Sequence, residues 1–344
     1  MIDTIKIYSE IPFEIHNSIK CKSIVKSSID NQTGEIMYEI INGHLEGSYS
    51  SSLSVRVGCG SKYSFSDLGY FIEIEGSYHK MKMGYNSHNG FYDLQEICKN
   101  LIKIVENFYK VDLPCIENWF LQRCDIAICF DLLNQNNVKY YINSLCRCSY
   151  PRRKIKTFFD ESLYSSGTTT TLKIYNKYLE FKKHDMKKFL FTDFDIQKYV
   201  EKIQGFVRFE CEIKKKMLIK LYNEKHIKIL DVKYEDLKKV WSDEFMKLLN
   251  LSNNELQIVR GREDVKNRLL KVYKKSKAMR LYNFYCAIQI EGIIDVKNSF
   301  QRCSYYRNIS DLKQASVDFS QIYKIEEIEQ SHFYFNPFES QEVA

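Results

Sequence analysis

The sequence predicts an α+β protein in which a mostly antiparallel central sheet, flanked by helices, precedes a mainly helical C-terminal region. Stretches of alternating polar and apolar residues are concentrated before residue 218, and helical spacing of apolar residues dominates from there to about residue 316. The composition of the 344 residues, 44% apolar and 28% charged, is ordinary for a globular protein. We therefore expect two domains, at residues 1–218 and 219–344.

The elements follow from local patterns. Alternation predicts strands within 53–75, at 123–131, on both sides of a turn at 165–167, and at 206–213. Helical spacing predicts a helix that begins at Asp93, a short one at about 136–146, and a charged helical stretch within 178–203. Beyond these, helices are expected at 233–251, near 264–281 and, as a helix–turn–helix pair, within 295–314, before a frayed end of about twenty residues.

Several classes of protein are excluded by composition. No apolar run approaches the ~18–20 residues of a membrane helix. The first residues, MIDTIKIYSE, lack the basic flank and apolar core of a signal peptide. The 11 cysteines are scattered without a CxxC pair, which favours reduced thiols over disulfides or a zinc site. We expect a cytoplasmic protein without a membrane partner.

The distribution of charge favours a nucleic-acid partner more than the net charge of +7 does. Basic residues cluster at 152–154, at 214–216 and through 266–280, and many of the 25 Tyr and 22 Phe lie next to these clusters. Cationic groups neutralise phosphates while aromatic rings stack on unpaired bases. Arg152, Arg153 and Lys154 are therefore candidate DNA-binding residues, although such clusters are also typical of solvated helix faces.

Ionisable residues share one face of four predicted strands, opposite an apolar face. Alternate residues of a strand point to the same side of a sheet. The polar faces therefore carry Arg123, Asp125, Cys129 and Asp131 on one strand, Arg208, Glu210 and Glu212 on another, Glu73 and Glu75 on a third, and Lys173, Tyr175 and Lys177 on a fourth.

Two interpretations of this face stay open. Carboxylates gathered on one face repel one another unless a cation neutralises them, and such hard oxygen ligands suit Mg²⁺ or Mn²⁺. Tyr175, between Lys173 and Lys177, would then be a nucleophile whose pKa the lysines lower. The alternative is a structural sheet whose polar face meets solvent through ordinary cross-strand pairs.

Four segments in order resemble a known family. They are IEIEGSYHKMKMGYN (72–86), RCDIA (123–127), LKIYNKYLE (172–180) and RFECEIKK (208–215), and the stretch 304–320 matches a C-terminal pattern of the same family. The chain resembles the rolling-circle replication initiators of the phage and plasmid II/X family, which includes the filamentous-phage gene II endonuclease, and the related Rep_trans-type plasmid initiators. The resemblance runs intermittently from about residue 70 to 320.

The resemblance implies a role for each matched residue. Tyr175 would be the residue that attacks DNA, Asp125 and Glu210 would hold the metal, and Glu75 is a weaker candidate ligand. Related plasmid proteins often have a second acid where this chain has Cys129, so Asp131, and Glu212 on the next strand, are additional candidates. Tyr164 and Tyr178 are the rival nucleophiles.

The implied reaction is a site-specific nick in one strand of origin DNA. Tyr175 would form a 5′-phosphotyrosyl link and release a 3′-OH that primes a polymerase, before later strand closure, with Lys173 or Lys177 offsetting the developing charge. No GxxxxGK[ST] motif is present, so a host helicase would unwind the DNA and a host polymerase would extend it. A homodimer is a further expected assembly.

The helical half is expected to recognise the origin. In the helix–turn–helix reading of 295–314, Tyr305, Tyr306 and Arg307 lie early in the second helix, where side chains would reach the major groove. Arg208, on the polar sheet face, is also assigned to DNA. The alternative function is a non-catalytic DNA-binding regulator of replication or transcription that keeps the fold without nicking.

Overall fold

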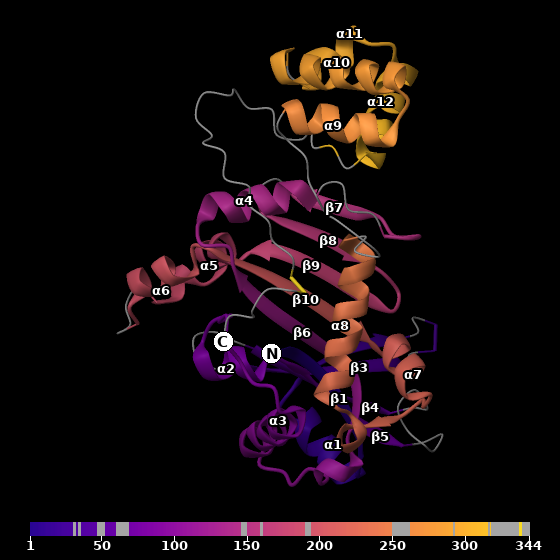
Figure 1. Cartoon of the computed structure of the whole chain (residues 1–344). Helices are drawn as coiled ribbons and strands as arrows, with labels where there is room; N and C mark the ends of the chain where they lie inside the picture. The colour runs from indigo at the N-terminus through magenta and orange to yellow at the C-terminus, as the bar shows by residue number, and fades with distance from the viewer. Residues whose placement is uncertain are drawn as a thin grey trace.

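A long antiparallel sheet forms the centre of the protein, and a separate group of helices follows at the C-terminal end (Figure 1). The computed structural model describes residues 1–29, 32–33, 36–46, 52–59, 69–145, 150–158, 161–189, 194–249, 262–291, 293–315, 317 and 337–338. The described strands are β1 (Ile2–Ile11), β2 (Ile24–Ile29), β3 (Ile36–Glu46), β4 (Ser52–Cys59), β5 (Tyr70–Gly76), β6 (Phe120–Asp131), β7 (Ile155–Phe158), β8 (Ser162–Ser166), β9 (Thr170–Asn176), β10 (Phe206–Lys214) and β11 (Ile227–Lys228).

The helices connect and flank these strands. They are α1 (Phe13–Lys20), α2 (Tyr78–Met83), α3 (Leu94–Tyr109), α4 (Gln135–Ser144), α5 (Lys177–His184), α6 (Ile196–Ile203), α7 (Lys215–Tyr222), α8 (Tyr234–Leu249), α9 (Arg262–Val272), α10 (Lys275–Glu291), α11 (Ile293–Ser299) and α12 (Arg302–Gln314). Short 3₁₀ turns occupy Ile116–Asn118, Met186–Phe189 and Ile229–Asp231.

The described strands form one sheet of 11 members in the order β2-β3-β4-β5-β1-β6-β10-β9-β8-β7, with β11 beside β6. Every pairing is antiparallel, which confirms the predicted fold class. The sequence patterns did not lead us to expect β1, although it lies at the centre of the sheet between β5 and β6. Its pairing with β6 contains two register shifts.

One face of the sheet is apolar and is covered by helices. Side chains such as Ile126, Ile174 and Phe209 are fully buried and share a core with residues of α3, α4 and α8. Asp93 begins α3 as expected, because its carboxylate accepts hydrogen bonds from the backbone N–H groups of the first turn. The charged side chains lie on the opposite face of the central strands, where a functional site can form.

The hydrophobic core of the sheet extends past the expected domain boundary at residue 218. β11 pairs with β6, and α8 contributes Leu237, Trp241 and Phe245 to the same core as the strands. The next core begins at Val265 and consists of residues from α9 onward. On this packing, the sheet body reaches Leu249, and the helical body starts with α9.

The helical body departs from the expected pattern at one point. We expected one basic helix near 264–281, but α9 ends at Val272 and α10 begins at Lys275, and the two pack against each other in the second core. The helix–turn–helix pair within 295–314 is confirmed as α11 and α12. The frayed C-terminal end lies outside the described residues, apart from 337–338. Within the part of the chain that is described, no helix combines the length and apolar character that a membrane span requires.

Candidate active site

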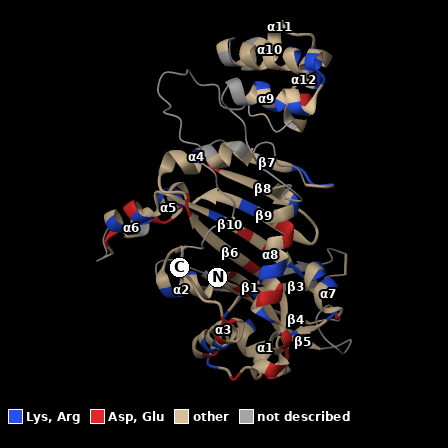
Figure 2. Cartoon of the chain, viewed as in Figure 1, with Lys and Arg blue, Asp and Glu red and all other residues tan. Residues whose placement is uncertain are grey.

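Five neighbouring strands direct ionisable side chains to the face opposite the core. The register pairs Lys173 of β9 with Glu210 of β10, and Glu212 of β10 with Asp125 of β6. It also pairs Arg123 of β6 with Lys6 of β1, and Lys6 with Glu75 of β5. Paired residues of antiparallel strands share a face, so acidic and basic groups alternate across this surface. Figure 2 shows both signs of charge on the central strands.

The hydroxyl of Tyr175 has two hydrogen-bond partners, Glu210 and Asn86. It donates a hydrogen bond of 3.2 Å to Oε2 of Glu210, whose Oε1 accepts a 2.6 Å bond from Nζ of Lys173. Glu210 is 5% exposed, so this carboxylate is largely removed from water. Burial raises the pKa of Tyr175 and outweighs the opposite effect of Arg208, while Glu210 raises the pKa further. The phenol is therefore neutral near pH 7, with its proton directed at a carboxylate.

The segment after α2 supplies the second hydrogen bond to Tyr175. Gly84 ends α2 with a φ of 83°, which favours glycine, and turns the chain toward the sheet. Nδ2 of Asn86 then donates to the Tyr175 hydroxyl at 3.2 Å and to Oε1 of Glu180 at 3.4 Å. The backbone N–H of Asn86 is held by Asp185 at 3.2 Å. Asn86 is thus fixed at both ends, and it fixes the phenol in turn.

Asp125 is the most deeply buried acid of the face, at 1% exposure. Arg123 binds both of its oxygens, with Nε–Oδ1 at 2.8 Å and Nη2–Oδ2 at 2.6 Å, and also reaches Oε1 of Glu75 at 2.9 Å. Burial, together with the negative charges of Glu210 and Asp3, raises the pKa of Asp125 to about 7 against the opposite effect of Arg123. These three carboxylates therefore act on one another within one region of the face.

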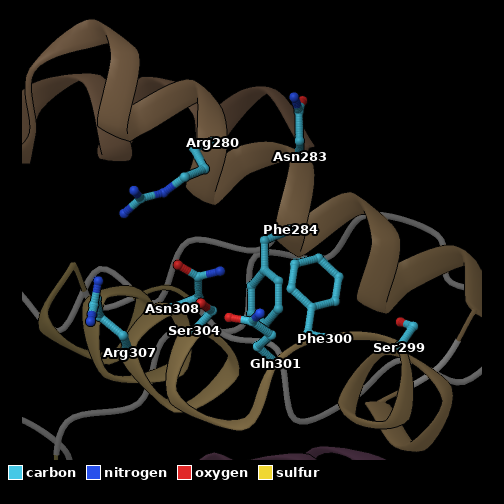
Figure 3. A pocket seen from close by; sticks show the side chains of 9 residues that line it. All are labelled: Arg280, Asn283, Phe284, Ser299, Phe300, Gln301, Ser304, Arg307 and Asn308. Atoms are coloured by element: carbon cyan, nitrogen blue, oxygen red, sulfur yellow. The ribbon is translucent and has the colours of Figure 1, made fainter.

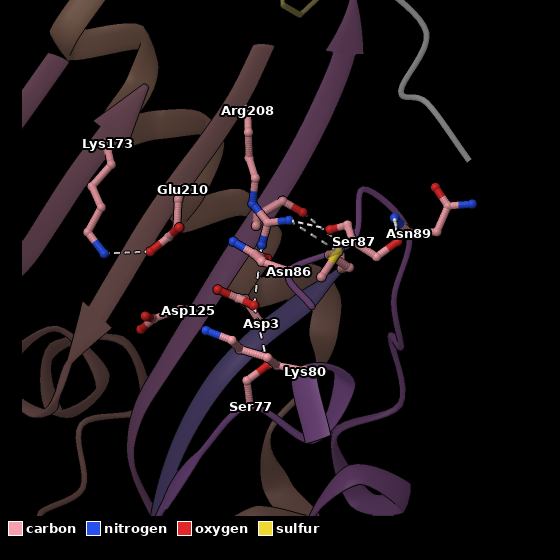
Figure 4. Close-up of polar contacts among 12 residues, drawn as sticks. Asp3, Ser77, Lys80, Asn86, Ser87, Asn89, Asp125, Lys173, Arg208 and Glu210 are labelled. Carbon is pink, nitrogen blue, oxygen red and sulfur yellow. Dashed lines mark hydrogen bonds and ion pairs between the residues drawn. The ribbon is translucent and has the colours of Figure 1, made fainter. Parts of the chain in front are cut away.

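Arg208 lies beneath this region and is completely buried. Its Nη1 donates to the carbonyl oxygen of Ser87 at 2.7 Å, and its Nη2 lies 3.3 Å from Oδ1 of Asp3 (Figure 4). Because Arg208 is the register partner of Tyr175, it places a permanent positive charge beside the phenol. It also joins the start of β1 to the loop that carries Asn86.

Residues 1–238 match the Phage_CRI family, described as the N-terminal part of a replication-associated protein of the gene II type. This match covers the whole sheet and most of the sequence. The chain belongs to this family. The resemblance to the rolling-circle initiators of filamentous phages is thereby confirmed, and origin DNA is the partner that such an initiator implies. No curated protein matches the chain.

The fold of this gene II-type replication protein brings together most of the residues selected from the sequence. Glu210 is in direct contact with both Tyr175 and Lys173, and Asp125 lies one strand away from Glu210. Glu75 is connected to Asp125 through Arg123. The rival Tyr164 also lies on this face, since it is the register partner of Lys173 on β8, whereas Tyr178 belongs to α5 and packs with a separate aromatic cluster.

Two expected positions on the charged face are corrected by the structure. β9 ends at Asn176, so Lys177 is not on the strand face of Tyr175; it opens α5, is fully buried and pairs with Glu180. Asp131 lies six residues beyond Asp125 on the same extended strand. The separation is about 20 Å, so the two carboxylates cannot bind the same metal ion. Glu212, in contrast, is beside Asp125, and its Oε2 lies 3.6 Å from Nη2 of Arg123.

The expected DNA-binding residues differ in exposure. Arg208 and Tyr305 are buried, and Tyr305 packs against Phe284 in the second core, so neither faces a DNA groove. Arg153 binds Thr170 and the buried Glu244, whereas Arg152 and Lys154 beside it are exposed. Tyr306 and Arg307 are also exposed. Direct contact with DNA stays a prediction for the four exposed residues.

Two residues of the site were not expected from the sequence. Asp3 comes from β1, which joins the sheet beside β6, and Asn86 comes from a loop that local patterns do not place. For Asn86 the available signal was its position at the end of the matched segment 72–86. For Asp3 the signal was an acid within a short alternating stretch, IDTIKIYSEI, at the start of the chain.

The acids of this gene II-type site are suitable ligands for a divalent metal, but they are not positioned to bind one together. Mg²⁺ and Mn²⁺ take hard oxygen ligands, which Asp3, Asp125 and Glu210 provide. Among the described residues, however, no group of three or more His, Cys, Asp or Glu side chains is placed to hold a metal ion. Arg123 occupies both oxygens of Asp125, and Lys173 and Tyr175 occupy those of Glu210.

Proposed function

We propose that this protein initiates rolling-circle replication by nicking one strand of origin DNA with Tyr175. The observation that carries the proposal is the hydrogen bond of 3.2 Å between the Tyr175 hydroxyl and Glu210. A tyrosine becomes a nucleophile when a neighbouring base accepts its proton. Glu210 is an acceptor in contact with that proton, on a face with cations on both sides.

The covalent step transfers one phosphoryl group. The phenolic oxygen of Tyr175 attacks the scissile phosphorus while its proton passes to Glu210. A bond forms between the tyrosine oxygen and phosphorus, and the bond from phosphorus to the 3′ oxygen breaks. The 3′ oxygen leaves with a proton from solvent as a free 3′-OH, and the 5′ end stays attached to Tyr175. Reversal of the same step, with a 3′-OH as nucleophile, closes the strand.

Nearby cations favour this step electrostatically. Lys173 lies 2.6 Å from Glu210 and is about a third exposed, so its ammonium group can also face a phosphate on the surface. Burial lowers the pKa of Lys173, but Glu210 outweighs this effect and the net pKa is raised, which keeps the amine charged. Arg208 adds a buried positive charge that favours the developing phenolate.

Dependence on Mg²⁺ or Mn²⁺ is part of the proposal, carried over from the family resemblance, with Asp125 and Glu210 as the ligands. A bound divalent ion would polarise the phosphoryl oxygens. To reach these oxygens, the ion would have to displace Arg123 from Asp125 and Lys173 from Glu210, since both cations contact the carboxylates in the structure.

Nicking of a supercoiled plasmid that carries the cognate origin tests the proposal. Wild-type protein with Mn²⁺ is expected to give relaxed circles with protein attached to the 5′ end. Tyr175→Phe should give no relaxed circles while it retains origin binding in a gel shift. Tyr164→Phe, which removes the rival hydroxyl beside Lys173, is the matched control and should nick normally. Nicking by Tyr175→Phe, or a gel shift without any nick by the wild type, would refute the assignment; the second result would favour the non-catalytic regulator.

A further inference from the structure

A hollow of about 750 Å³ lies between α10 and the segment that joins α11 to α12 (Figure 3). Its volume is within the range of about 300–1,000 Å³ that is typical of small-molecule sites. It belongs to the helical body, which has its own hydrophobic core and lies outside the family match at residues 1–238. No part of the proposed nicking site lines it.

Two arginines on different helices border one side of the hollow. Arg280 comes from α10 and Arg307 from α12, and both are exposed. None of the described residues that line the hollow is acidic. Asp311 follows Arg307 by one helical turn, but its carboxylate is paired with Lys277 at 3.0 Å. The two guanidinium groups are therefore available to an anion.

An aromatic ring and amide groups form the rest of the lining. Phe300 is 37% exposed, and its ring rests edge-to-face on the buried Phe284, with 5.1 Å between centroids. This contact fixes the Phe300 ring while it leaves part of the ring open. Asn308 is 6% exposed, and its amide points into the hollow beside Phe284 (Figure 3). Asn283 also borders the hollow, but its side chain is directed away from Phe300 (Figure 3).

We propose that this hollow binds one unpaired nucleotide of single-stranded DNA. The base packs on Phe300, the amide of Asn308 bonds to the base edge, and Arg280 and Arg307 bind the flanking phosphates. Aromatic rings stack on bases only where pairing has been opened, and arginines neutralise phosphates at any sequence. The inference rests on the proposed action on DNA, but it does not involve Tyr175.

This site replaces the expected reading of α12 as a major-groove helix. In that reading Tyr305, Tyr306 and Arg307 contact base edges together. Tyr305 is 5% exposed and belongs to the second core, so it has no access to a groove. Arg307 instead borders the hollow, where it meets an arginine from another helix.

Fluorescence anisotropy of the full chain with a labelled single-stranded oligonucleotide tests the proposal. The chain carries Tyr175→Phe, so that no covalent link forms. Phe300→Ala should weaken binding about tenfold, because stacking on an aromatic ring contributes about 1–3 kcal/mol per base. Ile290→Ala removes a more exposed apolar side chain of α10, which does not line the hollow, and should bind as the parent does. An oligonucleotide of the same length with abasic sites should bind the parent weakly.

The two arginines give a second, independent readout. Arg280→Ala and Arg307→Ala should each reduce the slope of log affinity against log salt by about 0.7, the value for one phosphate contact on a single strand. Lys271→Ala, on the exposed surface of α9 and outside the lining of the hollow, is the matched charge control and should leave the slope unchanged. Thermal unfolding of each variant checks that the helical body stays folded.

The outcomes separate this inference from the proposed function. Equal affinity for abasic and normal oligonucleotides, or an unchanged affinity of folded Phe300→Ala, would overturn the nucleotide site even if the wild type nicks origin DNA. Conversely, loss of affinity in Phe300→Ala supports the site even if the wild-type protein does not nick.

Discussion

The side-chain amide of Asn86 donates a hydrogen bond of 3.2 Å to the hydroxyl of Tyr175, although 89 positions separate the two residues in the sequence. The same hydroxyl donates to Glu210 on the other side. With one accepted and one donated bond, the phenol has a defined rotational position and its proton points at the carboxylate. The loop after α2 therefore determines the direction in which Tyr175 can lose its proton.

Removal of this contact should slow nicking without loss of the nucleophile. Asn86→Ala is expected to lower the nicking rate about tenfold, since a hydrogen bond of this kind contributes about 1–2 kcal/mol. Asn86→Asp, which cannot donate when ionised, should be at least as slow. Asn17→Ala, on the exposed side of α1, is the control and should nick at the parental rate. A parental rate for folded Asn86→Ala would show that the amide does not position the phenol.

Replacement of the proposed base should have a larger effect. Glu210→Gln keeps the size of the side chain but cannot take the phenolic proton, so nicking should fall by about 100-fold or more. Glu212→Gln removes an acid from the same face of β10 that does not contact Tyr175, and its effect should be much smaller. Single-turnover rates on an origin oligonucleotide measure both. Equal effects of the two changes would show that Glu210 contributes only its negative charge and does not accept the proton of Tyr175.

Metal dependence can be measured in two ways. Protein treated with EDTA is expected not to nick, and Mn²⁺ or Mg²⁺ should restore the activity. Since a ligand that binds only the folded state stabilises it, Mn²⁺ should also raise the melting temperature of the parent but not of Asp125→Asn. Full activity in EDTA would contradict the metal prediction and leave Arg123 and Lys173 as the relevant cations.

Two buried histidines should make stability depend on pH. Burial lowers the pKa of His79 and of His88 to about 4, and nearby cations such as Arg208 and Lys177 contribute. In the unfolded chain the pKa of a histidine is about 6.5. The unfolded chain thus binds more protons between these values, so the stability these residues contribute is present above about pH 6.5 and is lost as the pH falls toward 4.

Urea unfolding of the parent and of the double variant His79→Gln/His88→Gln tests this dependence. The parent should lose more unfolding free energy than the variant between about pH 7.5 and pH 5. Asp125 acts in the opposite direction, because its raised pKa gives stability that is lost as the pH rises toward 7. Asp125 is present in both proteins, so it cancels in the difference. Parallel pH profiles would show that the two imidazoles do not titrate as expected.

Arg153 and Lys154 should give different phenotypes despite their adjacent positions. Arg153 is largely buried and contacts Glu244, which also accepts hydrogen bonds from Tyr150 and Thr170. Arg153→Ala leaves Glu244 with less compensation and should lower the free energy of unfolding by about 3 kcal/mol. Lys154→Ala, at an exposed position, should leave stability unchanged and weaken DNA binding. Reversed phenotypes would refute the structural role of Arg153.

The charged face could be predicted from the sequence because a strand has a period of two. Once Ile126, Ile174 and Phe209 are taken as core residues, the opposite side of each strand follows without knowledge of its neighbours. The residues that complete the face could not be found in this way. Asp3 reaches the site because β1 pairs with β6, a contact between segments about 120 residues apart that local patterns do not contain.

The predicted position of Lys177 was wrong because the start of α5 was not recognised in the sequence. Asn176 accepts a hydrogen bond from the backbone N–H of Leu179 and caps α5, so Lys177 leaves the strand. An asparagine before a charged helical stretch is a recognised capping signal, and it would have given the correct end of β9. The break between α9 and α10 has no such signal. Tyr273, in this break, donates to the carbonyl oxygen of Asp311 in α12, a tertiary contact.

β10 is hydrogen-bonded along its length to β6 on one side and to β9 on the other. Insertion or deletion of one residue within this strand would move the side chains beyond that point to the opposite face of the sheet. Phe209 and Cys211 would then lie beside Lys173, and the acidic side chains would enter the hydrophobic core. Natural variants of the protein should therefore differ in length in their loops and keep the length of β10 constant.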